Sequence, residues 1–151
     1  MRCYYRCQYY FNARHSFDGK KEKAHAHTFT ILLYLGFRNK EEQSANMSVA
    51  DTIVTDFLKN YENQYLNELD GFQNTKATLE DIGNLFYEKL KELFRKTKLS
   101  LYQLDIAENP LSVYQVADRI LLPTLNMDNS KNNYDAILHQ KEQLREKHGK
   151  G

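Results

Sequence analysis

The chain has 151 residues, of which 41% are hydrophobic and 27% are charged, and its formal net charge is +1. This length fits one compact domain, and no apolar run reaches the length of a membrane span. A charge so close to neutral gives no reason to expect a nucleic acid or an acidic membrane surface as a partner. The polar start of the chain does not resemble a secretion signal, so the sequence predicts a cytoplasmic protein.

Two strands are predicted in the first part of the chain. Residues 3–15 alternate apolar and polar side chains, which indicates a long, half-buried strand. An exposed loop is expected over residues 17–23, because Asp18-Gly19 and a cluster of lysines interrupt the alternation. Residues 24–37 are rich in Thr, Ile, Leu and Tyr, which favours a second strand.

Two helices and two further strands are predicted after this pair. Apolar residues recur at helical spacing between Met47 and Tyr61, which indicates an amphipathic helix. Thr78 is a suitable N-cap for a second helix, whose apolar stripe runs from Leu79 to Phe94. Residues 99–107 and 111–117 are predicted to form strands on either side of a turn.

This order of elements predicts a fold of the α+β class. An antiparallel four-stranded sheet with both helices on one face accounts for it. We expect residues 1–117 to form the folded domain and residues 118–151 to form a C-terminal extension. The extension is mostly polar, and residues 134–147 are predicted to form a charged helix within it.

Three histidines form the clearest chemical pattern in the sequence. His25 and His27 lie two residues apart on a predicted strand, so their side chains project from the same face. His15 ends the preceding strand, and a hairpin between the two strands brings it opposite the pair. Three converging neutral imidazoles are the usual protein ligands of a catalytic zinc, which keeps a fourth position for water or substrate. The alternative is that these histidines are ordinary strand residues without a metal.

The residues around these histidines resemble a signature of the 6-pyruvoyltetrahydropterin and 6-carboxytetrahydropterin synthases. Residues 11–15 read Phe-Asn-Ala-Arg-His, which matches that family's Phe-x-Ala-x-His strand end. Residues 25–27 match its His-Gly-His motif, with Ala26 in place of the glycine.

Weaker motifs follow in the order that the family has. Tyr65-Leu66-Asn67, Gly71 and Thr78-Leu79-Glu80 match the family's loop between helices. Glu108 matches its pterin-recognition glutamate. The resemblance covers about residues 3–116.

The resemblance implies the tunnelling fold (T-fold), in which subunits close a β-barrel and place the active sites between chains. The protein is therefore expected to be a homo-oligomer, commonly a hexamer. The implied function is a zinc-dependent lyase acting on 7,8-dihydroneopterin triphosphate or a related pterin, with zinc held by His15, His25 and His27. Glu108 would hold the pterin ring, because a carboxylate accepts two parallel hydrogen bonds from an amino-pyrimidine edge. A solvated glutamate at a strand end is the alternative for this residue.

The family's proton-transfer groups are partly replaced in this chain. Its cysteine before the histidine pair is missing from a loop that carries Lys21 and Glu22. Glu22 is a candidate general base, and Lys21 is another if burial or a metal lowers its pKa. The family's Asp-His dyad is Glu62-Asn63 here, so Glu62 can keep the role of the acid but Asn63 cannot relay a proton. A solvated, charged loop is the alternative for Lys21 and Glu22.

Three functional hypotheses follow from the sequence. The first is an active zinc lyase of altered specificity that uses Glu22 or Lys21 together with Glu62. The second is a catalytically degenerate relative that binds zinc and pterin without lyase activity. The third is an interaction protein whose histidines hold zinc at a subunit contact. The family resemblance favours the first.

Overall fold

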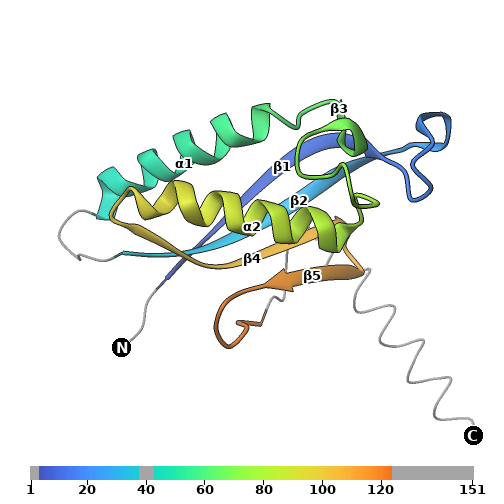
Figure 1. Ribbon diagram of the computed structural model, residues 1–151. Coiled ribbons are helices and arrows are strands. Elements are labelled where there is room, and N and C mark those ends of the chain that lie inside the picture. Colours follow the sequence, from blue (N-terminus) through green and yellow to red (C-terminus); the bar gives the residue numbers. More distant parts are fainter. Residues whose placement is uncertain (1–3, 38–42, 124–151) are drawn as a thin grey trace, which may run out of the picture.

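The computed structural model describes residues 4–37 and 43–123. Four long strands and two long helices occupy the predicted places in the chain (Figure 1). In chain order the elements are β1 (Tyr5–His15), η1 (Lys21–Lys23), β2 (His25–Phe37), α1 (Gln43–Lys59), β3 (Gln64–Tyr65), η3 (Leu66–Glu68), α2 (Leu79–Arg95), β4 (Leu99–Asn109) and β5 (Ser112–Val116).

The strands form one five-stranded sheet in the order β3-β1-β2-β4-β5. The pairs β1–β2, β2–β4 and β4–β5 are antiparallel, as predicted for the four long strands. β3 was not predicted, and it pairs with Ala13 and Arg14 of β1 in parallel, so the sheet is mixed and not purely antiparallel. Asn63 makes this pairing possible, because it adopts a left-handed conformation (φ 59°) and its N–H donates to the Asn12 carbonyl at 2.6 Å.

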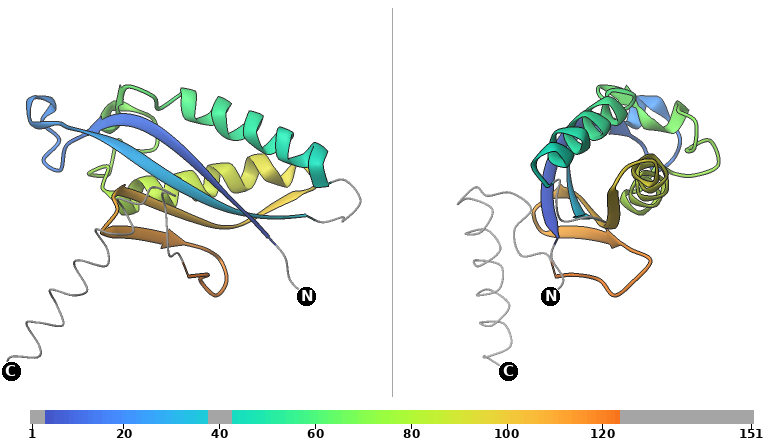
Figure 2. Two further views of the ribbon diagram at one scale, coloured as in Figure 1. Left: turned by 180° about the vertical axis from the view of Figure 1, so that it is seen from behind. Right: turned by 90° about the vertical axis from the view of Figure 1, so that its left-hand side faces the viewer.

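Both helices cover the same face of the sheet, which confirms that prediction (Figures 1 and 2). The core between them is aromatic: the Phe11 and Phe29 rings stack across β1 and β2 at 4.9 Å, and the Phe86 ring of α2 lies 5.3 Å from that of Phe11. Gly83 lets α2 approach the sheet closely, since a Cβ there would lie 2.7 Å from the Tyr114 ring.

The helix ends agree in part with the sequence. Thr78 caps α2 as predicted: its side chain accepts from the Asp81 N–H at 3.2 Å, and the Asp81 carboxylate accepts from the Thr78 N–H at 3.1 Å. This reciprocal capping box satisfies two backbone donors at the helix start. α1 begins at Gln43, earlier than its first predicted apolar residue, Met47. Neither helix is long and apolar enough to cross a membrane within the described residues.

A short segment after β5 lies against the face of the sheet that is away from the helices. Leu122 packs there on a small cluster that contains Leu32, and its N–H donates to Gln103 Oε1 at 2.6 Å. Asp105 is buried beside it and accepts from Gln103 Nε2 at 2.7 Å, and burial raises the pKa of this carboxyl group. Part of the predicted C-terminal extension therefore packs on the domain. The predicted charged helix over residues 134–147 lies outside the described residues.

Candidate metal site

The hairpin of β1 and β2 brings the predicted histidines to one end of the sheet. In its register His15 is opposite His25, and Ala13 is opposite His27. His15 is completely buried, His27 is partly exposed and His25 is exposed. The rings of His15 and His27 lie 5.1 Å apart between centroids and are almost perpendicular, with an interplanar angle of 80°.

The His15 ring is oriented by a backbone carbonyl of the loop before α2. Its Nδ1 lies 2.7 Å from the Ala77 oxygen. A carbonyl can only accept, so Nδ1 carries the proton and the lone pair of the neutral ring is on Nε2. Such a carbonyl contact is the usual device that fixes the tautomer and orientation of a metal-binding histidine. Ala77 has a left-handed backbone (φ 47°), which is uncommon for a residue other than glycine, so this loop holds its carbonyl in a strained conformation.

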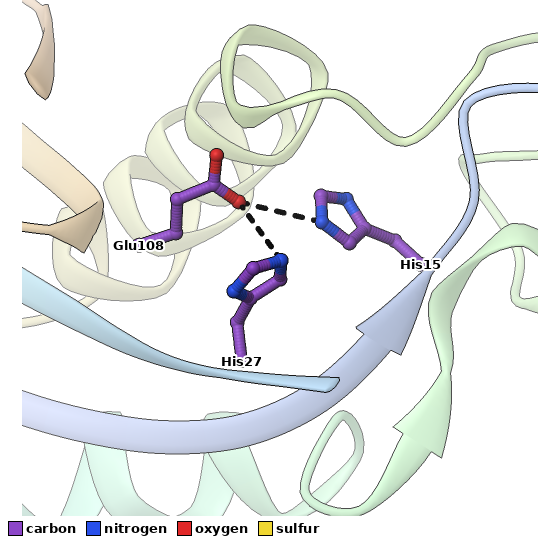
Figure 3. A group of neighbouring side chains, drawn as sticks. All are labelled: His15, His27 and Glu108. Atoms are coloured by element: carbon purple, nitrogen blue, oxygen red, sulfur yellow. Dashed lines mark ion pairs between the residues drawn. The ribbon is translucent and has the colours of Figure 1, made fainter. Parts of the chain in front are cut away.

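Glu108, at the end of β4, is the third member of this site (Figure 3). Its Oε2 lies 3.4 Å from His15 Nε2 and 3.5 Å from His27 Nε2. Within residues 4–37 and 43–123, the oxygen and His15 Nε2 are both buried and have no hydrogen-bond partner. A buried polar atom left without a partner costs about 1–3 kcal/mol.

A divalent cation is the partner that these atoms fit. One ligand atom from each of His15, His27 and Glu108 lies within 4.8 Å of the others. Two imidazole nitrogens and one carboxylate oxygen are also a known ligand set of catalytic zinc. Among the described residues, His15, His27 and Glu108 therefore form the candidate metal site.

The protonation of His27 is compatible with this role. Burial lowers the pKa of its imidazole, and the neighbouring rings of His15 and His25 lower it further, while the Glu108 carboxylate acts in the opposite direction. A lowered pKa favours the neutral ring, and a neutral imidazole has the lone pair that a metal needs.

Two neighbours of His15 fix the backbone on which it lies. The Asn67 side chain pairs with the peptide of Ser16: Oδ1 accepts from the Ser16 N–H at 3.0 Å, and Nδ2 donates to the Ser16 carbonyl at 2.8 Å. The Ser16 hydroxyl lies 2.8 Å from the Tyr65 hydroxyl. Asn67 and Tyr65 belong to the motif matched in the sequence, but their contact with Ser16 was not predicted. The Ala77 carbonyl was missed as well, because a backbone contact leaves no pattern in the sequence.

Substituting Asn67 with alanine is expected to weaken zinc binding about tenfold, in line with the effect of removing other groups that support metal ligands. The reason is that the Ser16 backbone loses its two hydrogen bonds to the Asn67 side chain, so His15 is no longer held in place. Zinc affinity, measured by competition with a chromophoric chelator, checks this. The matched control is Asn60→Ala, since the Asn60 side chain donates to the Phe57 carbonyl, three residues earlier in the chain. An Asn67→Ala protein that folds and binds zinc as tightly as the wild type would contradict the positioning role.

The remaining predicted metal ligand, His25, is not part of this group. It is the first residue of β2, and its ring centroid lies 6.3 Å from that of His27. Its side chain is exposed in the single chain.

Two of the predicted proton-transfer residues lie on the exposed turn between β1 and β2. Lys21 and Glu22 are exposed on η1, and the Lys21 ammonium group lies 3.4 Å from the Glu68 carboxylate. In the described part of the chain, no hydrogen bond or ion pair joins Lys21 or Glu22 to His15, His27 or Glu108.

The Glu62 side chain is hydrogen-bonded to Asn12 of β1. Its two carboxylate oxygens accept from the backbone N–H and the side-chain amide of Asn12, each at 3.0 Å. The Asn12 side chain in turn accepts from the Thr28 hydroxyl at 2.6 Å. Asn12 and His15 lie on opposite faces of β1, because side chains alternate along a strand. A single chain therefore does not bring Glu62 to the three candidate ligands.

Comparisons with known proteins agree with this description of the fold. The family model described as 6-pyruvoyl tetrahydropterin synthase matches residues 5–119. No curated protein matches the chain by sequence. A structure of Caenorhabditis elegans 6-pyruvoyl tetrahydropterin synthase is similar, with a TM-score of 0.63 and 18% identity over 78% of this chain and 96% of that one.

A second solved structure is less similar. It is that of an uncharacterized protein, WS1659, from Wolinella succinogenes, with a TM-score of 0.45 and 10% identity over 78% of this chain and 100% of that one. A likeness of this size supports no conclusion. The match to the Caenorhabditis elegans structure, at its low identity, establishes the fold and not the reaction.

Proposed function

The chain belongs to the 6-pyruvoyl tetrahydropterin synthase family, and on that basis we propose that it is a zinc-dependent lyase acting on 7,8-dihydroneopterin triphosphate or a related pterin. The observation that supports a metal-dependent reaction is the convergence of His15 Nε2, His27 Nε2 and Glu108 Oε2 at one end of the sheet. Two of these atoms are buried without any other partner among the described residues, which is the arrangement expected of a site built for a cation.

The protein's own groups would perform defined parts of the reaction. A bound zinc ion supplies Lewis acidity, which acidifies the C–H bonds next to the substrate hydroxyls and stabilises developing negative charge. The Ala77 carbonyl keeps the proton of His15 on Nδ1, so that Nε2 stays available as a ligand. Glu108 retains, by family resemblance, the role of accepting hydrogen bonds from the pterin ring. Glu22, Lys21 and Glu62 remain the candidates for proton transfer.

A second function, binding of zinc and pterin without turnover, has one observation in its favour. No group suited to proton transfer contacts the metal site within one described chain: Lys21 pairs with Glu68, and Glu62 is bound by Asn12. The family's cysteine and histidine are also missing from the corresponding positions. An active enzyme would need Glu22, Lys21 or Glu62 from a neighbouring subunit.

We propose further that the protein is a homo-oligomer, a hexamer by family resemblance. In the described part of the chain, β5 is the last strand of the sheet on one side, and on the other side β3 covers only Ala13 and Arg14 of β1. Such edges pair readily with strands of another copy. Light scattering should give a mass that is a multiple of 17.9 kDa, and a stable monomer would contradict this proposal.

A turnover assay tests the proposed reaction. The zinc-loaded full chain is incubated with 7,8-dihydroneopterin triphosphate, and the products are followed by liquid chromatography and mass spectrometry. We expect release of triphosphate and a new pterin, and we expect both to disappear in His27→Ala and after removal of zinc with a chelator. Intact substrate in the presence of a zinc-loaded, oligomeric wild type would contradict the lyase and favour the binding function.

A further inference from the structure

We infer that the segment after β5 covers the part of the β4 edge that extends beyond β5, and that it thereby restricts pairing with another copy of this chain, on this side of the sheet, to β5. This segment, the strap, comprises residues 117–122. The inference depends on neither a metal nor a pterin, so its failure would leave the proposed reaction untouched.

β5 pairs with only part of β4. The pairing runs from Leu104 to Asn109, whereas β4 begins at Leu99. Residues 99–103 therefore extend beyond β5 on the side of the sheet away from β2. A strand edge presents backbone donors and acceptors to other chains, and native proteins cover such edges with loops or blunt them with charged residues and proline.

One end of the strap is fixed on the helix side of the sheet. The Asp118 carboxylate accepts from the Tyr87 hydroxyl and from the Lys91 ammonium group of α2, both at 3.1 Å. The Asp118 N–H donates to the Tyr87 oxygen at 3.3 Å. Tyr87 is buried, so this contact attaches the strap to the body of the domain.

The other end of the strap is fixed on the opposite face of the sheet. Leu122 packs there on a small apolar cluster that contains Leu32 and Tyr34. Its N–H donates to Gln103 Oε1 at 2.6 Å, and its carbonyl accepts from Nε2 of Gln103 and of Gln115, each at 3.0 Å. Side chains therefore bind both backbone groups of Leu122, as a neighbouring strand would otherwise do.

Asp105 holds the two glutamines in the orientation that binds Leu122. Its carboxylate accepts from Gln103 Nε2 at 2.7 Å and from Gln115 Nε2 at 3.2 Å. Because each amide nitrogen has two hydrogens, one can go to Asp105 and the other to the Leu122 carbonyl. The Gln103 amide cannot turn over without placing its oxygen against the carboxylate. Gln103 and Asp105 are buried, which shields these hydrogen bonds from water.

The strap crosses the edge of β4 between these two ends. Asp118 lies on α2 and Leu122 lies on the opposite face of the sheet, and only residues 119–121 connect them. The Arg119 guanidinium group lies 5.9 Å from the centre of the Tyr102 ring in β4, and both residues line the same cavity beside α2. Figures 1 and 2 show the strap within the orange loop that follows β5.

The composition of the strap suits a cover for a strand edge. Asp118 and Arg119 place two charges at the crossing, and Pro123, which follows the strap, has no N–H to offer to another strand. A second copy that approached residues 99–103 would have to break the hydrogen bonds of Asp118 and Leu122 first. Release of the strap is therefore expected to create a further surface for self-association.

Two full-length variants release the strap at its two ends. Gln103→Met keeps the approximate size of the buried side chain but removes its hydrogen bonds to both backbone groups of Leu122. Asp118→Ala removes the carboxylate that α2 binds, and since Asp118 is exposed, this variant keeps the test valid if Gln103→Met does not fold. Gln8→Met is the matched control, because the Gln8 amide donates to the Tyr10 hydroxyl on β1.

Hydrogen exchange of residues 117–122, followed by mass spectrometry, measures the release. We expect the strap to be protected in the wild type and in Gln8→Met, and to exchange about tenfold faster in Gln103→Met and Asp118→Ala, the change expected for about one net hydrogen bond. Exchange in the wild type as fast as in these two variants would overturn the attachment of the strap.

Analytical ultracentrifugation of the same samples measures self-association. Gln103→Met and Asp118→Ala are expected to form species larger than the wild-type assembly, in amounts that increase with protein concentration, while Gln8→Met keeps the wild-type mass. Faster exchange of the strap without larger species would overturn its covering role, and so would equally large species in Gln8→Met.

Discussion

Replacing His15 with alanine is expected to abolish zinc binding at concentrations that saturate the wild type, and with it all turnover. His15 is the fully buried member of the candidate site, and its Nε2 has no hydrogen-bond partner in the part of the chain that the structure describes. The substitution removes a ligand outright and leaves Glu108 with a single imidazole. Loss of a supporting group alone costs about 10–100-fold in metal affinity, so loss of the ligand should cost more than about 100-fold. Chelator competition and metal analysis of the purified protein measure this.

A control for His15→Ala is available on the adjoining strand. His25 is opposite His15 in the hairpin but is exposed. His25→Ala therefore also removes one imidazole, but it leaves the buried His15 Nε2 and Glu108 Oε2 in place. We expect it to bind zinc like the wild type. The circular dichroism of His15→Ala should remain that of a folded α+β protein, because the variant keeps the aromatic core. Zinc affinity equal to that of the wild type in a folded His15→Ala protein would show that His15 is not a zinc ligand.

Replacing Phe86 with alanine is expected to lower the free energy of unfolding by about 3–5 kcal/mol, the usual cost of deleting a buried phenyl ring. Phe86 is completely buried on α2. Its ring centroid lies 5.0 Å from that of Phe57, in α1, and 4.6 Å from that of Tyr61, just after α1. It also lies 5.3 Å from the Phe11 ring of the sheet. One ring therefore joins both helical segments to β1. Urea unfolding followed by circular dichroism measures the change.

Leu93→Ala, on the same helix, is the control for this effect. Leu93 is 38% exposed, so its truncation removes less buried surface and should cost well below the value for Phe86. Both substitutions lie away from the candidate ligands, so zinc affinity of the folded fraction should not change. Equal destabilisation by Phe86→Ala and Leu93→Ala would contradict the central place of the Phe86 ring in the core.

The strands and helices were predictable because their side chains repeat with clear periods. The alternation in residues 5–15 reflects a strand with one face in the core, and the spacing of Phe86 and Leu90 reflects a helix that packs on it. β3 was missed because two residues, Gln64 and Tyr65, are too few to show a period. It exists only because the turn at Asn63 lays it against β1, which is a tertiary effect.

Only the part of the site that is formed by one hairpin was predictable from the sequence. The approach of His15 to His27 follows from the register of two neighbouring strands. The position of Glu108 depends on the sheet order, which places β4 beside β2, and on the point where their pairing ends. Alternation also predicted His25 on the same face as His27. The two differ in exposure, because His25 begins the strand at the exposed end of the hairpin. No local sequence pattern predicts the position of Glu108 or the exposure of His25.

Anomalous diffraction at the zinc absorption edge, on crystals of the zinc-loaded full chain, tests most directly whether the protein has a metal centre at this end of its sheet. We predict one strong peak for each chain, within bonding distance of His15 Nε2 and His27 Nε2. A peak elsewhere, or no peak in a protein shown to be saturated with zinc in solution, would contradict the site on which the proposed reaction depends.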